Sequence, residues 1–364
     1  MDKRHQLIKD NFNQSCKKHG MVEFPTAPLL TDDKTVYYAS ATITPLKEIL
    51  ASGQIPTEGL FLHQPCFRLK YIDEPFYNGS KIRYPGYFNM LGTLVQPKNI
   101  LDLQEVIIQI IDDQDIPHDK VKIDVSDKDK FLVKKLKDKY KIEYNLRSDS
   151  SYQWTYGMGE NISGRGLTLL LQQDNGEYKR IGQYIAISDN GKLISCEYGV
   201  GIEVMLARKE QYENEYDAFS IASILQQNKL AVDFANTHIF SSVASAYGAG
   251  ITMDKYPRKG YKKGLNRMLT NLLLLKIRDG LSDEQIMTVS KRFMITEFGN
   301  AVALSNLMHD FKTKESELND QIVKASAFAK NQQRLGRTDD FISQRISDMY
   351  PLYTTYNDMF KSSR

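Results

Sequence analysis

Two arginines beside aromatic residues form the first pattern in the sequence that could do chemistry. Arg68 lies near the end of one run of β-forming residues, and Arg83 lies just before a second run that contains Tyr87 and Phe88. A guanidinium group is permanently charged and can donate two parallel hydrogen bonds to a phosphate or a carboxylate. The pattern therefore suits a phosphate ester attached to a flat ring, although solvated arginines on an edge hairpin would give the same sequence.

An acidic residue precedes a pair of glycines in the segment SCEYGVGIEVMLAR, residues 195–208. We expect a strand that runs into a turn at Gly199 and Gly201 and then into a helix that begins near Ile202. Such a turn lets a ligand approach the backbone closely, and a helix N-terminus favours anions. Glu197 could hold an ammonium group in this setting, but an ordinary turn beside an exposed strand carboxylate fits the same residues.

A run of basic residues begins at Lys255 and ends at Arg267, with no acidic residue between them. Its members are Lys255, Arg258, Lys259, Lys262, Lys263 and Arg267. Lys259, Lys263 and Arg267 follow at the four-residue spacing of one helix face. A basic stripe of this kind suits a phosphate backbone, and a solvated lysine face is the alternative.

The composition limits the class of protein. The 364 residues are 41% hydrophobic and carry a formal net charge of +3, which allows two or three domains and gives no polybasic tail. Three widely separated cysteines and six scattered histidines predict neither a disulfide framework nor a metal site. The N-terminus lacks the apolar core of a signal peptide, and no apolar run is long enough to span a bilayer. We therefore expect a soluble cytoplasmic protein without a membrane partner.

Hydrophobic alternation and turn residues predict a sheet in the first half of the chain and helices in the second. Strands are predicted at 35–39, 60–69, 84–94, 120–125, 168–173, 178–186 and 193–198, and helices at 6–19, 45–51, 100–112, 127–140, 221–228, 231–247, 262–278, 283–291 and 315–335. The fold class is therefore α+β, an antiparallel β-sheet flanked by helices and followed by an all-α domain. The predicted domains are 1–215 and 216–364.

Several segments, taken together and in order, resemble class II aminoacyl-tRNA synthetases, and alanyl-tRNA synthetases in particular. They are VYYASATITPLKEILASG, QPCFR, IRYPGYFNMLG, YQWTYGMGE, SCEYGVGIEVM, ANTHIFSSVASAYGAG and KGYKKGLNRML. QPCFR and IRYPGYFNMLG resemble the two strands of the family's motif 2, and SCEYGVGIEVM resembles motif 3. The resemblance spans the family's catalytic and acceptor-stem domains, and we find no counterpart of its editing domain.

The resemblance implies roles for individual residues. Arg68 would bind the α-phosphate of ATP and the substrate carboxylate as the catalytic residue, Phe88 would stack on adenine, and Glu197 would hold the α-ammonium group. The residues expected to bind ATP are Arg68, Arg83, Phe88, Glu203 and Arg208. The residues expected to bind the amino acid are Met90, Glu197, Gly199 and Gly201. The residues expected to bind tRNA are Arg258, Lys259, Lys262, Lys263 and Arg267.

The sequence differs from the family at several positions where members of the family bind the nucleotide. Motif 3 of the family ends in Glu-Arg and its arginine grips the γ-phosphate, but here a valine follows Glu203. Arg208, one helical turn later, and Arg165 are the candidate replacements. Asn89 takes the place of a glutamate, and Glu197 takes the place of an aspartate, so its longer side chain would crowd or shift alanine.

These features lead to alternatives from different functional classes. The first is a specialised ligase that activates a small amino acid with ATP and Mg²⁺ and transfers it to the acceptor stem of a tRNA. The second is a catalytically inactive synthetase paralogue that acts as a tRNA-binding or regulatory subunit. A ligase with a non-tRNA acceptor is a third, and the basic stripe weighs against it. We expect tRNA rather than DNA as the partner.

Overall fold

The computed structural model describes residues 2–31, 33, 35–79, 81–147, 153–256 and 259–361. The chain divides into two compact units: the first is Met1–Lys70 with Tyr84–Asp233, and the second is Tyr71–Arg83 with Phe234–Arg364. The division after Asp233 differs from the predicted boundary after residue 215. The reason is that Ala218 packs in the core of the first unit, where its carbonyl oxygen lies 2.6 Å from Nε2 of His5.

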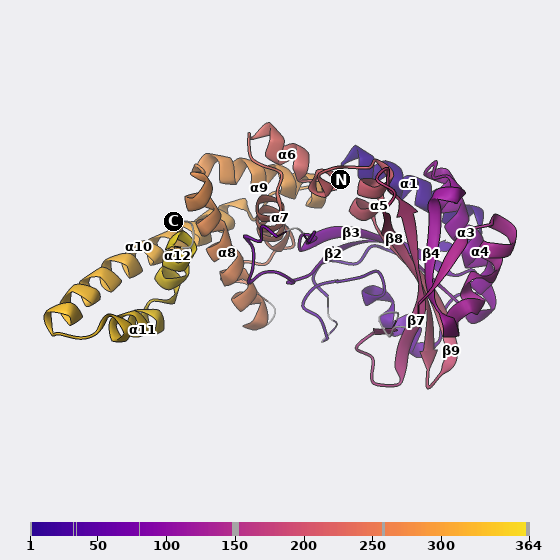
Figure 1. Ribbon diagram of the computed structural model, residues 1–364, viewed down its shortest axis with the longest axis horizontal. Coiled ribbons are helices and arrows are strands. Elements are labelled where there is room, and N and C mark those ends of the chain that lie inside the picture. The colour runs from indigo at the N-terminus through magenta and orange to yellow at the C-terminus, as the bar shows by residue number, and fades with distance from the viewer. Residues whose placement is uncertain are drawn as a thin grey trace. The chain divides into compact units, whose positions relative to one another are not determined.

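A sheet of nine strands, counted over the described residues, forms the centre of the first unit (Figure 1). The strands are β1 (Val22–Glu23), β2 (Leu60–Phe67), β3 (Tyr87–Val95), β4 (Val121–Ser126), β5 (Glu143–Arg147), β6 (Gln153–Thr155), β7 (Ile162–Gln172), β8 (Tyr178–Asp189) and β9 (Lys192–Gly201). Their order is β1-β2-β3-β9-β8-β7-β4-β5, with β6 paired to β7 off this path. β1–β2 and β4–β5 are parallel and the other pairs are antiparallel, which confirms the expected antiparallel sheet.

The two faces of the sheet are covered differently because side chains alternate along each strand. The helices of the first unit are α1 (Lys3–Lys18), α2 (Lys47–Ser52), α3 (Ile100–Asp113), α4 (Lys134–Tyr140), α5 (Ile202–Lys209) and α6 (Ala222–Gln227). One face packs against α1, α3, α4 and α5 through buried residues such as Phe12, Ile107 and Met205. The other face carries a smaller cluster around Leu46 and Ile185, with contributions from α2 and the loop before it. We call these the helix-covered face and the open face.

The turn predicted at Gly199 and Gly201 is wrong. Both glycines are extended residues of β9, where Gly199 pairs with Gly92 of β3 and Gly201 pairs with Met90. Helix α5 begins only at Ile202. Continuous pairing with β3 uses the backbone hydrogen-bonding groups that a turn would have left free, so these glycines act as strand residues rather than as an anion-binding loop.

The second unit is helical, as expected, over its described residues. It contains α7 (Phe234–Gly248), α8 (Lys259–Asp279), α9 (Asp283–Phe298), α10 (Leu304–Arg334), α11 (Asp339–Met349) and α12 (Pro351–Lys361), of which α11 and α12 were not predicted. α7 packs on α8 and α9, and α11 and α12 pack on the long helix α10 (Figure 1). The loop 71–83 belongs here because Asn271 Nδ2 donates a 2.9 Å hydrogen bond to the carbonyl of Ile72. No helix in the described part of the chain has the length and apolar character needed to cross a bilayer.

Candidate functional site

A cavity of about 600 Å³ lies on the open face of the sheet in the first unit. Four residues predicted from the sequence line it, namely Arg68, Met90, Glu197 and Gly199. Other lining residues include Thr42, Lys47, Trp154, Tyr156, Arg180 and Gln183, which were not assigned roles in advance. The cavity therefore gathers side chains from β3, β6, β8 and β9, from Arg68 just after β2, and from α2 and the loop that leads into it.

Strand register explains why residues distant in the sequence meet here. Gly199 of β9 pairs with Gly92 of β3 and with Gln183 of β8, and Glu197 pairs with Ile185. Directly paired residues point to the same face of an antiparallel sheet. Positions two residues apart along one strand also share a face, which adds Met90 to the set.

A glycine lets the loop before α2 pack directly on the sheet. A Cβ atom at Gly92 would lie 2.4 Å from Oγ1 of Thr42, which is far inside van der Waals contact. At Gly199, by contrast, a Cβ atom would make ordinary contacts, 3.5 Å from Cε of Met90 and 3.8 Å from Oγ1 of Thr42. Gly92 therefore fixes the position of Thr42, while Gly199 keeps space free on the cavity floor.

Arg68 is held at the edge of the cavity by backbone and aromatic contacts. Its Nε and Nη2 atoms donate hydrogen bonds of 2.9 and 2.7 Å to the carbonyl oxygen of Ser40. Its guanidinium carbon lies 4.8 Å from the centroid of the Phe88 ring, a distance typical of a cation–π contact. No carboxylate in the described residues pairs with Arg68, so its charge is positioned but not neutralised.

Glu197 is a buried carboxylate that faces the cavity. The hydroxyl of Tyr156 donates a 2.7 Å hydrogen bond to its Oε1 atom. Burial raises the pKa of Glu197 to about 7, and the hydrogen bond from Tyr156 opposes this rise by favouring the ionised form. A carboxylate in this state is suited to bind a cation such as a protonated amine, which would replace part of its lost hydration.

Two further cations line the cavity. Lys47 is neutralised within the protein, because its Nζ atom lies 2.7 Å from Oδ2 of Asp33 and 2.9 Å from Oγ1 of Thr35. The exposed side chain of Arg180 has no hydrogen bond or ion pair with any described residue. Sequence reasoning missed Arg180 because strict alternation along β8 places it on the opposite face of the sheet.

The arginines proposed to replace the missing motif 3 arginine are engaged elsewhere in the first unit. Arg208 is buried and forms an ion pair with Glu215 and a hydrogen bond to the hydroxyl of Tyr84. Arg165 forms an ion pair with Asp129, with Nη2 and Oδ2 3.1 Å apart. Neither of the two arginines lines the cavity.

Four other predicted ATP- or amino-acid-binding residues also lie outside the cavity lining, namely Arg83, Phe88, Glu203 and Gly201. The carboxylate of Glu203 is buried and accepts hydrogen bonds of 2.9 and 3.1 Å from the backbone N–H of Asn89. Gly201 ends β9, where an added Cβ atom would lie 3.3 Å from Cγ2 of Val204. Arg83 lies in the second unit, and its Nη2 atom is 2.7 Å from Oε2 of Glu74.

The basic stripe lies on α8 of the second unit. Lys259, Lys262 and Lys263 have exposed side chains, as a nucleic-acid-binding face would require. Arg267 is also exposed, but its Nη2 atom lies 2.6 Å from Oδ1 of Asp73. Arg258 lies outside the described residues.

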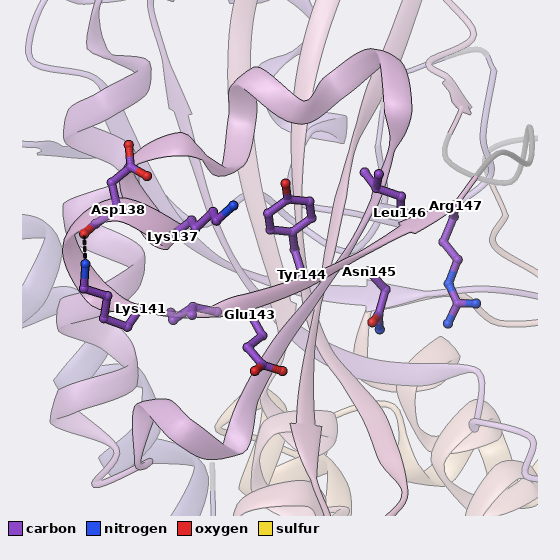
Figure 2. Close-up of a pocket in the computed structure, with 9 residues that line it drawn as sticks. Lys137, Asp138, Lys141, Glu143, Tyr144, Asn145, Leu146 and Arg147 are labelled. Atoms are coloured by element: carbon purple, nitrogen blue, oxygen red, sulfur yellow. Dashed lines mark hydrogen bonds between the residues drawn. The ribbon is translucent and has the colours of Figure 1, made fainter.

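A second, more open hollow of about 970 Å³ lies between the end of α4 and the edge strand β5 (Figure 2). Its charged groups are largely paired with their own surroundings. Lys141 donates to the carbonyl of Asp138, and Arg147 donates to Oδ2 of Asp124 at 3.2 Å. The cavity on the open face combines an unneutralised arginine with a buried carboxylate, and it is therefore the candidate site.

No protein-family model matches the sequence, and no curated protein matches it. Among solved structures, the chain is similar to apo histidyl-tRNA synthetase from S. aureus, with 12% identity over 62% of this chain and 78% of that one and a TM-score of 0.39. It is also similar to aspartyl-tRNA synthetase from Entamoeba histolytica (13% identity, 60% and 56% of the chains, TM-score 0.37) and to pyrrolysyl-tRNA synthetase PylSc from Desulfitobacterium hafniense (9%, 58% and 68%, TM-score 0.35). The α+β architecture is established by the sheet and helices of this chain.

Proposed function

We propose that this protein activates a small amino acid as its adenylate with ATP and transfers the aminoacyl group to the acceptor end of a tRNA. The observation that carries the proposal is the placement of Arg68 and Glu197 in one cavity. An amino acid has a carboxylate and an ammonium group, and these two side chains offer one partner for each. The narrow floor between Thr42, Met90 and Gly199 supports a small side chain.

The proposed reaction starts with the amino acid bound between Glu197 and Arg68. An oxygen of its carboxylate attacks the α-phosphorus of ATP, a P–O bond forms, and the P–O bond to the β-phosphate breaks to release pyrophosphate. Arg68 would bring the two anions together and offset the charge that develops between them, so catalysis is mainly positioning and electrostatic stabilisation. A ribose hydroxyl of the tRNA then attacks the activated carbonyl and AMP leaves.

The lining residues fit the phosphates of a nucleotide better than they fit a free metal ion. Arg68 and Arg180 are cations without an ion pair among the described residues, Lys47 is a cation paired with Asp33, and Glu197 is the one carboxylate among the described lining residues. In the described part of the chain, no group of three or more His, Cys, Asp or Glu side chains is arranged to hold a metal. Mg²⁺ therefore belongs to the proposal as the ion that accompanies ATP, bound through its phosphates.

The tRNA part of the proposal is supported by the exposed lysines of α8. Lys259, Lys262 and Lys263 offer three charges on one helix, and none of them pairs with a carboxylate among the described residues. Lysines of this kind release counterions when they meet a phosphate backbone, which gives binding a strong salt dependence.

The test is amino-acid-dependent exchange of pyrophosphate into ATP, measured with each standard amino acid, with and without bulk tRNA. We expect exchange with a small amino acid, and we expect Arg68→Ala to abolish it. Arg147→Gln, which removes the same charge from the edge strand β5, is the control and should leave exchange intact. Exchange that survives in Arg68→Ala would refute the assignment of Arg68.

A second candidate is an inactive paralogue that binds tRNA. It is favoured by the ion pairs of Arg208 and Arg165, which remove both expected replacements for the γ-phosphate contact. Such a protein would bind tRNA through α8 but show no exchange with any amino acid. Exchange together with aminoacylation of a carrier protein instead of tRNA would identify the third alternative, a ligase with a non-tRNA acceptor.

A further inference from the structure

The side chain of Arg180 reaches the cavity because of an irregularity in β8. Leu169 of β7 pairs with Gly182, but the next residue, Leu170, pairs with Arg180, so Ile181 is an extra residue on β8. Ile181 packs in the core of the helix-covered face, while Arg180 lines the cavity on the open face. A β-bulge shifts the alternation of a strand and can redirect a side chain. Here it turns Arg180 toward Arg68.

Two guanidinium groups therefore share one cavity without a carboxylate between them. The pKa of Arg68 is lowered by its partial removal from water and further by the positive charge of Arg180. Among the described residues, the guanidinium group of Arg68 donates only to the neutral carbonyl of Ser40, and Arg180 has no ion pair. Like charges placed together are unfavourable unless an anion joins them. The nearby carboxylate of Glu197 accepts a hydrogen bond from Tyr156 and forms no ion pair with either arginine.

We propose that Arg180 and Arg68 form a two-arginine site for the polyphosphate chain of the nucleotide, with Arg180 on the phosphates that leave as pyrophosphate. This inference rests on the proposed function for the nucleotide but names a residue that the family resemblance does not supply. It also explains how the chain compensates for the valine after Glu203: the lost contact is replaced from β8 and not by Arg208 or Arg165. Arginine suits this task because its fork of donors matches phosphate geometry.

The test compares the binding of three anions to the full chain, without amino acid or tRNA. ATP, inorganic tripolyphosphate and AMP are titrated into the wild type, Arg180→Gln, Arg180→Lys and the control Arg147→Gln, with binding heats as the readout. For Arg180→Gln we expect the affinity for ATP and tripolyphosphate to fall about tenfold or more, since one charge-assisted contact is lost. The affinity for AMP should change less than about twofold, Arg180→Lys should recover part of the loss, and Arg147→Gln should match the wild type.

Folding does not confound the comparison, because the Arg180 side chain makes no hydrogen bond or ion pair with the described residues and is exposed. We expect the melting temperature of Arg180→Gln to equal or exceed that of the wild type, since repulsion with Arg68 is relieved.

Equal tripolyphosphate affinity in the wild type and Arg180→Gln would overturn this inference and leave the proposed function standing. A third outcome separates the two proposals. If tripolyphosphate binding depends on Arg180, but ATP binds no more tightly than tripolyphosphate and no pyrophosphate exchange occurs, the anion site is supported and the ligase function is refuted. Failure of the wild type to bind any of the three anions would overturn the two-arginine site directly.

Discussion

Tyr156 and Glu197 form a hydrogen bond of 2.7 Å that spans the open face of the sheet from the segment after β6 to β9. The phenol can reach across because Gly164 of β7 has no side chain: a Cβ atom there would lie 2.7 Å from the Tyr156 hydroxyl. The hydrogen bond from the neutral Tyr156 hydroxyl thus fixes the orientation of the Glu197 carboxylate without neutralising its charge. The free charge remains available for a bound ammonium group.

Tyr156→Phe should weaken amino-acid binding at neutral pH. The hydrogen bond favours the ionised carboxylate, so its loss should raise the pKa of Glu197 further, by about one unit for one charge-assisted hydrogen bond. The acidic limb of the pH profile of KM for the amino acid should therefore move to higher pH, with kcat nearly unchanged. Tyr144→Phe on β5 is the control, and an unmoved limb in Tyr156→Phe would show that the phenol does not tune the carboxylate.

Glu197→Gln should stabilise the ligand-free protein in alkaline solution. Burial raises the pKa of Glu197 from 4.5 to about 7, so the folded protein binds this proton more tightly than the unfolded chain does. The free energy of unfolding of the wild type should therefore fall as the pH rises from about 4.5 through about 7, by up to about 3 kcal/mol from this group. Gln has no such titration and should be the more stable variant at pH 8.

Urea unfolding at pH 4 and pH 8 checks this prediction for Glu197→Gln. The difference from wild type should be small at pH 4 and should appear at pH 8, while Glu177→Gln in an exposed turn should differ from wild type at neither pH. A Glu197→Gln variant that is less stable than wild type at pH 8 would mean that the carboxylate is stabilised in the empty cavity.

The sequence predicts the hairpin of β2 and β3, the strands β8 and β9 and most helices, because these follow local hydrophobic periods and turn residues. It also places Arg68 and Glu197 in one site, although only through a resemblance to a family. It misses Arg180, because a single extra residue in β8 reverses which face of the sheet the preceding side chains point to. The local sequence of β8 does not indicate this extra residue. It does not reveal the ion pair between Arg208 and Glu215, because Glu215 is supplied by a later segment whose approach depends on tertiary packing.

The lysines of α8 should contribute most of the salt-dependent affinity for tRNA. Changing Lys259, Lys262 and Lys263 together to Gln should weaken binding and reduce the slope of log affinity against log salt by about 3 if each contacts a phosphate. Filter binding over a range of salt concentrations measures both quantities. As a control, a triple Gln variant of Lys134, Lys137 and Lys139 on α4 carries the same charge change and should retain the wild-type slope. If the α8 variant and the α4 control have the same slope, the α8 stripe is only a solvated face.

Gly92→Ala and Gly199→Ala should have different effects, although each adds one methyl group on the same face of the sheet. The new Cβ at Gly92 would lie 2.4 Å from Oγ1 of Thr42, so the loop before α2 must move and the protein should lose about 1–3 kcal/mol of stability. At Gly199 the nearest atoms lie 3.5 and 3.8 Å away, so the fold should be kept while the methyl group fills space on the cavity floor. We therefore expect Gly199→Ala to melt near the wild-type temperature but to raise KM for the amino acid, with KM for ATP nearly unchanged. If KM for both substrates stays at the wild-type value in Gly199→Ala, the amino acid does not lie against this strand.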